Sequence, residues 1–391
     1  MKVLFVISTL DTGGAQRVLS NLVMKLPEDW EIEILLNDDA SISYPYKGKI
    51  LSLNIEPEKN KQKLTYQLKV FLKRMHTLRR LKRSGKYDAC ISFMDSANFA
   101  NILSGKKYCK VISSIHIHMT QQVRMSKKYQ LFIKPFMKLY NFSDKVVAVS
   151  EASRRDLIEN FGIKEERLVT IYNGIDLKQE VLQNNQEILP EYDFATMGRL
   201  DLQKGQWHLI KVFREFVKEV PSAKLVILGD GEYYDFYLEQ IEKLNLQNNI
   251  ILKGFVDNPL EEIQKSKIFV FPSLFEGFPN AIVEAMACGK PVISCDFDSG
   301  AREIIAPDTD CMKRIPNDVE YARYGILVPV CESNVPEDLT GKLSSREQEL
   351  LEAMKRLYLD TAICEKYGQM SVERAGQLSV ENMAEQWACL V

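Results

Sequence analysis

The sequence predicts an α/β protein built from two doubly wound parallel sheets. Short apolar runs typical of buried strands alternate with helical segments along the chain, and such alternation implies parallel sheets joined by right-handed crossovers. A chain of 391 residues is long for one domain and comfortable for two, each with its own core. A polar stretch from Asp176 to Leu189 separates the halves and is the predicted linker.

The predicted elements follow the same order in both halves. In the first half, the strand Val3–Ile7 precedes a helix near Ala15–Leu26. The further strands expected there are Glu31–Leu36, Ala89–Phe93, Val111–Ile115 and Lys145–Val149. The strands expected in the second half are Tyr192–Met197, Ala223–Leu228, Ile250–Leu252, Ile268–Phe271 and Pro291–Cys295. We therefore expect an N-terminal domain over residues 1–183 and a C-terminal domain over 184–379, with a tail helix near 380–391 packing back on the first.

Composition excludes several classes of protein. No run approaches the roughly 18 apolar residues of a membrane span. The eight cysteines are scattered, without a CxxC pair or a histidine at metal spacing, so we expect reduced thiols in the cytosol and no zinc site. Residues 1–183 carry a net charge of roughly +11 and the remainder roughly −13. Nucleic acid is not an expected partner, because the second half is acidic and aromatic residues do not interleave with the basic ones.

Much of the positive charge lies in two segments, Lys69–Lys86 and Arg124–Lys138, where basic residues alternate with apolar ones at helical spacing. Basic amphipathic helices of this kind can lie on an anionic membrane. The alternative is a solvated helix whose apolar face packs on its own domain. The sequence leaves both interpretations open.

Two carboxylates eight positions apart form the most informative pattern. The predicted strand Ile268–Phe271 ends before Glu276, and Asn280 is a plausible N-cap for a helix through Cys288. Glu276 should therefore lie on a strand-to-helix loop, and Glu284 one turn inside the helix. That helix is apolar almost all round, so a buried Glu284 needs a polar partner. This favours a binding site over an exposed loop and an ordinary surface helix.

Other candidate site residues also follow predicted strands, where ligands gather in open parallel sheets. Gly13 and Gly14 open the first helix and would let a ligand approach backbone amides at its N-terminus, although a tight turn would explain them equally. Arg199 and Lys204 could bracket a diphosphate with a planar fork and a point charge, or they could simply be solvated cations.

Two later strands end in further candidates. Gly229 belongs to the loop Gly229-Asp230-Gly231 after the second strand of this half. Phe255 and Val256 follow the third strand and could offer a nucleotide base their backbone edge.

Taken in order, these motifs resemble the retaining glycosyltransferases of family GT4, whose GT-B fold has two Rossmann-like domains facing a central cleft. The resemblance covers nearly the whole chain. Its elements are Gly13-Gly14, Asn173-Gly174-Ile175-Asp176, Gly198-Arg199-Leu200 with Lys204-Gly205, Gly229-Asp230-Gly231, and the Glu-x7-Glu pattern from Glu276 to Glu284.

The N-terminal motif resembles a subgroup with a GGAERV-type sequence that often builds lipid-linked bacterial glycans. This chain has Gln16 where that subgroup usually has glutamate. Residues 298–304 resemble the SGxRE element of the same subgroup.

The resemblance implies a role for each candidate in the C-terminal half. Arg199 and Lys204 would hold the donor diphosphate and stabilise the leaving group, so that no metal or other cofactor is required. Glu284 would accept hydrogen bonds from the ribose hydroxyls. Glu276 would bind donor-sugar hydroxyls. The neighbouring loop residues of this donor site would be Gly277, Phe278, Pro279 and Asn280. The other donor-site residues would be Gly229, Phe255 and Val256 in the same half, and Gly13 and Gly14 in the first half.

The resemblance also implies roles in the first half. His116, at the end of a predicted strand, matches the family's active-site histidine, and His118 would lie on the same strand face. Gln16 and Arg17 would lie on the acceptor side.

The implied activity is transfer of a hexose or N-acetylhexosamine from a UDP-sugar, with retention, to a glycan acceptor. The expected acceptor is a polyprenyl-diphosphate-linked intermediate of bacterial O-antigen or capsule assembly. The expected location is the cytoplasm, at the inner face of the cytoplasmic membrane. The alternative functions are a nicotinamide dehydrogenase, whose fingerprint is missing, a GT-B epimerase of UDP-sugars, and a non-catalytic nucleotide-binding scaffold.

Overall fold

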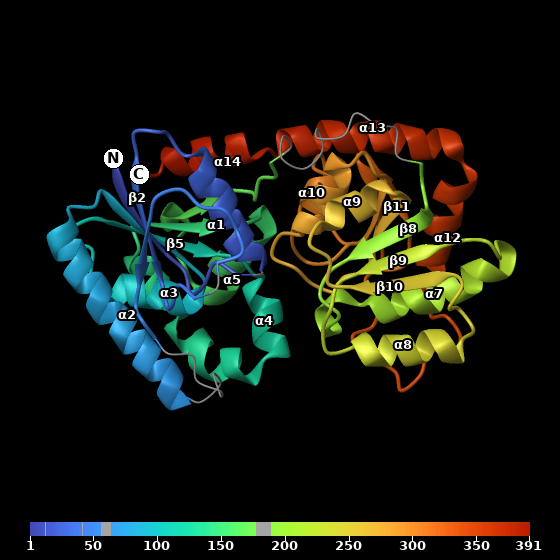
Figure 1. Cartoon of the computed structure of the whole chain (residues 1–391), viewed down its shortest axis with the longest axis horizontal. Helices are drawn as coiled ribbons and strands as arrows, with labels where there is room; N and C mark the ends of the chain where they lie inside the picture. Colours follow the sequence, from blue (N-terminus) through green and yellow to red (C-terminus); the bar gives the residue numbers. More distant parts are fainter. Residues whose placement is uncertain (12, 41, 56–63, 177–188) are drawn as a thin grey trace. The chain divides into compact units, whose positions relative to one another are not determined.

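The computed structural model describes residues 1–391 with the exception of 12, 41, 56–63 and 177–188. The chain divides into two compact units (Figure 1). Unit 1 comprises Met1–Asp176 and Ser379–Val391, and unit 2 comprises Leu177–Leu378. Most of the predicted linker, and the predicted domain boundary at residue 183, lie outside the described residues.

Unit 1 contains a seven-stranded sheet in the order β3-β2-β1-β4-β5-β6-β7, and all of its described strand pairs are parallel. The strands are β1 (Lys2–Val6), β2 (Glu31–Leu36), β3 (Lys49–Ser52), β4 (Ala89–Phe93), β5 (Lys110–Ile115), β6 (Lys145–Ala148) and β7 (Leu168–Thr170). The helical elements are α1 (Gly14–Lys25), α2 (Leu64–Gly85), α3 (Asp95–Leu103), α4 (Met119–Met125), η1 (Tyr129–Ile133), η2 (Lys134–Phe142), α5 (Glu151–Phe161), η3 (Glu165–Arg167) and α14 (Val380–Ala388).

The sheet of unit 1 is buried on both faces, which explains why β1 reads as a continuous apolar run. Val3 and Phe5 pack in the core that α1 and α14 complete, whereas Leu4 and Val6 pack in the core beneath α2 and α3. Successive side chains of a strand point to opposite faces, so one apolar run serves both cores. The tail helix α14 adds Trp387 to the core on the α1 side.

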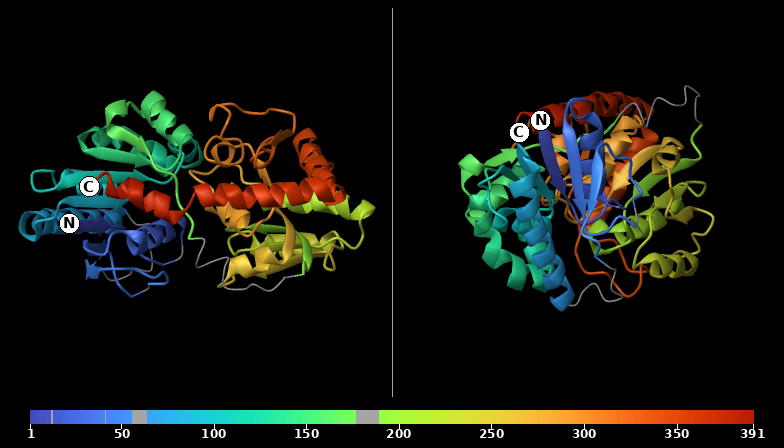
Figure 2. Two further views of the ribbon diagram at one scale, coloured as in Figure 1. Left: turned by 90° about the horizontal axis from the view of Figure 1, so that it is seen from above. Right: turned by 60° about the vertical axis from the view of Figure 1, so that its left-hand side comes forward.

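Unit 2 contains a second seven-stranded sheet, in the order β10-β9-β8-β11-β12-β14-β13. Figure 2 shows the ribbon of this unit from two further directions. The strands are β8 (Tyr192–Met197), β9 (Leu225–Leu228), β10 (Ile250–Gly254), β11 (Ser266–Phe271), β12 (Val292–Cys295), β13 (Glu320–Ala322) and β14 (Gly325–Val328). The helical elements are η4 (Leu202–Lys204), α7 (Gln206–Glu219), α8 (Tyr234–Lys243), α9 (Pro259–Gln264), α10 (Asn280–Ala287), α11 (Ala301–Ile305), α12 (Ser345–Leu359) and α13 (Thr361–Gln377).

Two parallel-sheet α/β units confirm the predicted fold class. The bounds of the predicted strands agree with the structure to within two residues. The strands β3, β7, β13 and β14 were not predicted, and β13 pairs antiparallel with β14 at the edge of the second sheet. These strands are only three or four residues long, so their periodicity is too short to separate them from loops.

Candidate active site

The loops after β8, β9 and β11 meet at one edge of the sheet in unit 2. Because β8 lies between β9 and β11, and all three run parallel, their carboxyl ends share that edge. The backbone amide of Gly198 donates to the carbonyl of Leu228 at 2.9 Å, and that of Leu200 donates to Asp230 at 2.9 Å. The sequence motifs around Arg199 and Gly229 are therefore joined by backbone hydrogen bonds.

Glycine is required at position 229, because the loops after β8 and β9 approach each other closely there. A β-carbon at this position would lie 2.0 Å from the carbonyl oxygen of Gly198, and the φ angle of 139° is unfavourable for other residues. Any side chain here would push the β8 and β9 loops apart.

Lys204 and Glu276, distant in sequence, form an ion pair at this edge. The Lys204 Nζ lies 2.5 Å from Glu276 Oε1, and the two side chains are only 16% and 10% exposed. Lys204 ends the short helix η4, whose N-cap residue Asp201 accepts a hydrogen bond from the Lys204 amide at 3.2 Å. The ammonium also lies 5.2 Å from the centre of the Phe271 ring. Two predicted site residues are thus brought into direct contact.

Two residues that the sequence did not single out hold the same carboxylate. Gln203 Nε2 donates to Glu276 Oε2 at 2.9 Å and to the carbonyl of Phe275 at 2.9 Å. Ser273 Oγ donates to Glu276 Oε1 at 3.1 Å. Both residues lie in the predicted site loops, so their polarity within those loops was the available signal. Glu276 is therefore a fixed hydrogen-bond acceptor on both oxygens.

Arg199 follows β8, as predicted, but its guanidinium pairs with Asp201 at 3.0 Å rather than with Glu276. Its side chain is 74% exposed. An exposed ion pair of this kind is worth about 0–1 kcal/mol, so an anionic ligand could draw the guanidinium away at little cost.

Glu284 lies inside α10, and its side chain is buried. The prediction that Asn280 caps this helix is wrong: Asn280 is the first helical residue, and Pro279 occupies the N-cap position. The Ile282 amide donates to the Pro279 carbonyl. Proline has no amide hydrogen of its own that would need a partner at the start of the helix. The helix ends at Ala287, one residue earlier than predicted.

The remaining donor-site candidates in unit 2 differ in exposure. Phe278 is buried beside Gly277 in the Glu276 loop. Phe255, just after β10, is 65% exposed, and Val256 is half-buried. The backbone of residues 254–256 is thus at the surface of the strand-end edge.

In unit 1, Gly13 is the N-cap of α1, which begins at Gly14 after β1. A β-carbon on Gly13 would lie 2.3 Å from Gln16 Oε1, so the Gln16 side chain folds over this glycine. The amide of Arg17 donates to the Gly13 carbonyl at 3.0 Å. The four N-terminal candidates therefore form one compact turn.

The two candidate histidines have different environments. His116 follows β5, is half-buried, stacks on Phe93 with ring centres 5.2 Å apart and lies 2.9 Å from Ser114 Oγ through its Nε2. Packing around the ring lowers the pKa of His116 to about 4, so the imidazole is neutral at pH 7.

His118 is buried at the N-cap position of α4, with Nδ1 3.8 Å from Asp156 Oδ2. The predicted shared strand face is wrong, because β5 ends at Ile115.

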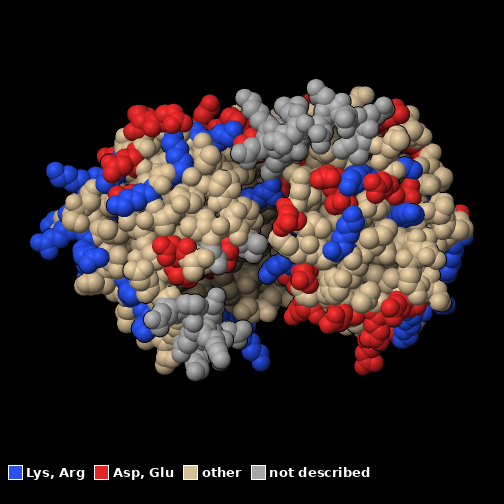
Figure 3. Space-filling model, in the orientation of Figure 1, with Lys and Arg blue, Asp and Glu red and all other residues tan. Residues whose placement is uncertain are grey.

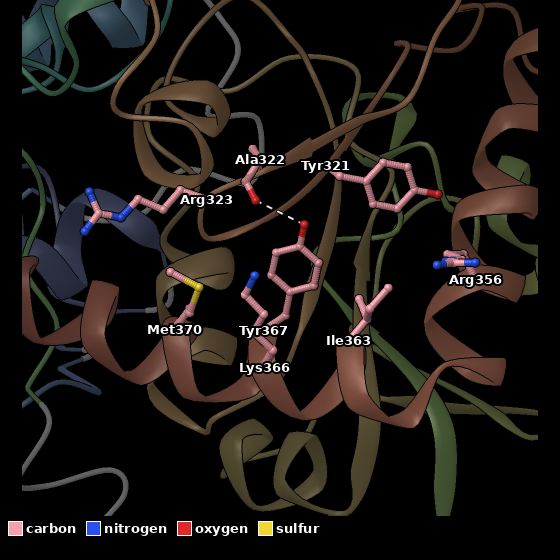
Figure 4. A pocket seen from close by; sticks show the side chains of 8 residues that line it. All are labelled: Tyr321, Ala322, Arg323, Arg356, Ile363, Lys366, Tyr367 and Met370. Carbon is pink, nitrogen blue, oxygen red and sulfur yellow. Dashed lines mark hydrogen bonds between the residues drawn. The ribbon is translucent and has the colours of Figure 1, made fainter.

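A separate cavity of about 670 Å³ lies elsewhere in unit 2 (Figure 4). It is bounded by β13, α12 and α13, and the Tyr367 hydroxyl on its wall donates to the Ala322 carbonyl at 3.0 Å. Ala322 pairs with Gly325, the first residue of β14, which places this cavity at the opposite end of the strand from the carboxyl edge. None of the predicted site residues lines it.

Among the described residues, no group of three or more His, Cys, Asp or Glu side chains could hold a metal ion. No helix within those same ranges combines the length and apolar character needed to cross a membrane.

Solved structures with this architecture are GT-B glycosyltransferases. The Anabaena protein HepE, in complex with UDP and glucose, matches with a TM-score of 0.75 and 20% identity over 100% of this chain and 99% of that one. Sucrose-phosphate synthase from Thermosynechococcus elongatus matches with a TM-score of 0.76 and 17% identity, over 100% and 98% of the two chains. The fold of this chain is therefore GT-B.

Sequence comparison places the chain more narrowly. The model for glycosyl transferases group 1 matches residues 178–320, and that for glycosyltransferase family 4 matches residues 12–179. An uncharacterized glycosyltransferase of Methanocaldococcus jannaschii is 30% identical over 88% of each chain. The N-acetylgalactosamine-N,N'-diacetylbacillosaminyl-diphospho-undecaprenol 4-alpha-N-acetylgalactosaminyltransferase of Campylobacter jejuni is 30% identical over 84% of this chain and 86% of its own. The chain belongs to glycosyltransferase family 4, as its motifs predicted.

Proposed function

We propose that this glycosyltransferase moves a hexose or N-acetylhexosamine from a UDP-sugar to a polyprenyl-diphosphate-linked glycan, with retention of configuration and without a metal. The Lys204–Glu276 pair carries the proposal, because it sets a cation suited to a diphosphate directly beside a carboxylate suited to sugar hydroxyls. The name of the C. jejuni relative, with its diphospho-undecaprenol acceptor, supports the acceptor class. The UDP and UDP-glucose complexes of HepE support the donor class.

In the proposed reaction, Lys204 and Arg199 stabilise the negative charge that develops on the departing diphosphate. An acceptor hydroxyl oxygen bonds to the anomeric carbon on the face from which UDP leaves. The bond from that carbon to the β-phosphate oxygen breaks, and the hydroxyl proton passes to the same phosphate oxygen. Positioning of the two substrates, rather than an enzymic nucleophile, lowers the barrier.

Glu276 is better suited to accept hydrogen bonds from sugar hydroxyls than to act as a nucleophile or to carry a proton. Its two oxygens are already held by Lys204, Gln203 and Ser273, which fixes the position of the carboxylate. Lone pairs that remain can accept hydrogen bonds from sugar hydroxyls. The buried Glu284 is assigned to the ribose, and the neutral His116 to the acceptor-side face of the donor sugar.

The proposed location, at an anionic membrane, is supported by an exposed apolar and basic surface on unit 1. On η1 and η2, Leu131, Phe132 and Phe136 are 65%, 50% and 52% exposed. The exposed cations beside them are Arg124, Lys127, Lys128, Lys134 and Lys138. Apolar side chains that enter the interface, surrounded by lysines, are typical of membrane-surface binding.

The other basic segment, on α2, contributes less than its sequence suggests. Arg74 and Lys82 were counted in the patch but are buried, and Arg74 donates to Asn37 Oδ1 at 2.5 Å. Lys82 donates to the carbonyls of Asn101 and Gly105 at 2.9 Å each. Other cations of α2 remain exposed. Figure 3 shows Lys and Arg side chains gathered at the left-hand end of the view.

The activity is tested by incubation with a panel of UDP-sugars and a polyprenyl-diphosphate-linked sugar. The expected result is transfer in the presence of EDTA, with a product whose anomeric configuration by NMR equals that of the donor. The Lys204→Ala variant serves as the inactive control. Interconversion of UDP-sugars without an acceptor would support the epimerase instead, and an inverted product would refute retention.

Membrane binding is tested by sedimentation with vesicles of phosphatidylglycerol and phosphatidylethanolamine. The Leu131→Ser and Phe132→Ser variants should sediment less than the wild type, and binding should weaken in salt. Leu359→Ser is a matched control, because Leu359 is 74% exposed but belongs to unit 2. Equal sedimentation of all four proteins would refute this surface.

A further inference from the structure

Residues 299–302, called here the supporting turn, comprise Ser299, Gly300 and the first two residues of α11; they lie after β12 and contact the loop that carries Glu276. Ser299 Oγ donates to the carbonyl of Gly277 at 2.6 Å, and Ser299 is buried. This hydrogen bond fixes the peptide group between Gly277 and Phe278, one residue beyond Glu276. None of the roles proposed above involves the supporting turn.

Gly300 makes the closest contact between the turn and the loop. Its φ angle of +88° is one that other residues rarely adopt. A β-carbon at Gly300 would lie 2.6 Å from Pro279 Cδ, 3.1 Å from Phe278 Cα and 3.2 Å from the Gly277 carbonyl oxygen. Three consecutive loop residues therefore rest against a backbone that leaves no room for a side chain.

Arg302 anchors the supporting turn to the sheet. It is buried, and its Nε and Nη2 donate to both oxygens of Asp296 at 3.1 and 2.7 Å. Its Nη1 and Nη2 also reach both oxygens of Glu320 in β13, at 3.2 and 3.1 Å. Two bidentate pairs fix the guanidinium in plane and position. The turn is thus a rigid base rather than a mobile segment that follows the loop.

We infer that Ser299 and Gly300 are positioning residues for the donor sugar, which act by holding the backbone of residues 277–280 in register with Glu276. A binding constellation must be held to within about 0.5 Å of its productive geometry, and this requires support from a second layer of contacts. The inference rests on the proposed function, since it assumes that residues 276–280 bind the donor. It assigns a role to the element at 298–304 that the sequence only identified.

A purely structural role would produce a different result. The hydrogen bond of Ser299 would then stabilise unit 2 as any buried serine does, without an effect on donor affinity. Ser266 provides the comparison, because its Oγ donates to the Ile263 carbonyl at 2.7 Å and it is equally buried, but at the amino end of β11. Gly105 is the comparison for Gly300, with φ +91° and open space around it in unit 1.

The test compares the Ser299→Ala and Gly300→Ala variants with the controls Ser266→Ala and Gly105→Ala. Affinity for the best-bound UDP-sugar of the panel is measured by titration calorimetry, and thermal unfolding is followed for each variant. The two supporting-turn variants should bind the donor about tenfold more weakly than their controls, a difference of about 1.4 kcal/mol. The two serine variants should lose similar thermal stability, and Gly300→Ala should lose more than Gly105→Ala, because only the β-carbon at Gly300 meets close neighbours. Donor affinities within twofold of the controls would overturn the inference.

Hydrogen–deuterium exchange of the ligand-free proteins supplies a second readout. The amides of residues 277, 278 and 280 should exchange faster in both supporting-turn variants than in the controls. Unchanged exchange would overturn the inference even if a donor binds. Failure of the wild type to bind any UDP-sugar would instead refute the proposed function, and the exchange data would still decide whether the turn holds the loop.

Discussion

Replacement of Lys204 or Glu276 by alanine tests the donor site most directly. At a separation of 2.5 Å and with little exposure, removal of one partner leaves a charge in a partly desolvated position. Loss of one partner from a fully buried pair costs about 3–5 kcal/mol, and the partial exposure here lowers the expected cost to about 1–3 kcal/mol. The cost should be smaller for Lys204→Ala, because Glu276 keeps its hydrogen bonds from Gln203 and Ser273.

The expected catalytic effect is larger than the effect on stability. Loss of one donor aimed at transition-state charge typically costs about 2.7–4 kcal/mol, so Lys204→Ala should lower kcat by about 10²–10³-fold. Rates at saturating donor and acceptor give kcat, and calorimetry gives the melting temperature, which should fall by about 2–4 °C per kcal/mol for a unit of this size.

Lys267→Ala is the matched control for this prediction. It removes an ion pair of 2.8 Å with Asp193, at the amino end of the same strand β11, and should leave kcat unchanged. Wild-type turnover in both Lys204→Ala and Glu276→Ala would refute the site assignment. A double-mutant cycle with no coupling between the two positions would refute the energetic reasoning.

Three further predictions concern stability. The pKa of His116 falls from 6.5 to about 4 on folding, so the unfolded chain protonates this imidazole at a higher pH than the folded chain does. The free energy of unfolding should therefore fall by about 3 kcal/mol between pH 6.5 and 4. Urea titrations of His116→Asn should lack this contribution to the loss of stability. Met94→Gly should raise the free energy of unfolding by about 1 kcal/mol, because φ +74° with ψ 152° is a strained backbone for methionine, and a lower melting temperature would contradict this. Both ring nitrogens of His208 face acceptors at 2.8 Å, Glu347 Oε1 and the Glu332 carbonyl, and these partners raise the pKa of His208. The stability that they contribute should be lost as pH rises through the folded-state pKa. Glu347→Gln should abolish this pH dependence of the melting temperature.

The sequence predicted the elements whose signal is local. A buried parallel strand of five or six residues shows as an apolar run, and β2, β4 and β8 were placed with their observed bounds for that reason. The two carboxylates were correctly separated into a loop and a helix, because the apolar run ends at Pro272 before Glu276, and Gly277 and Pro279 interrupt the periodicity between the two carboxylates. The family followed from motifs that each occupy a few consecutive residues after a strand.

The candidate site was predicted less completely, because its geometry depends on pairing between loops. Gln203 binds Glu276 from about 70 residues away in the sequence, and Ser273 binds it from three residues away. Neither residue belongs to a periodic pattern or a motif. Arg74 and Lys82 were read as surface charge, since a helical pattern shows which face is apolar but not which long cations turn inward to bond carbonyls and amides.

By itself, the sequence determined the fold class, the order of most elements and the strand ends at which the motifs lie, because these depend on burial patterns within ten or so residues. The tertiary structure alone decided which side chains meet. It paired Lys204 with Glu276, placed α14 against α1 in unit 1, and set the supporting turn against residues 277–279. Such contacts depend on strand order and on the packing of loops that are many tens of residues apart, so a pattern within a short segment of sequence does not predict them.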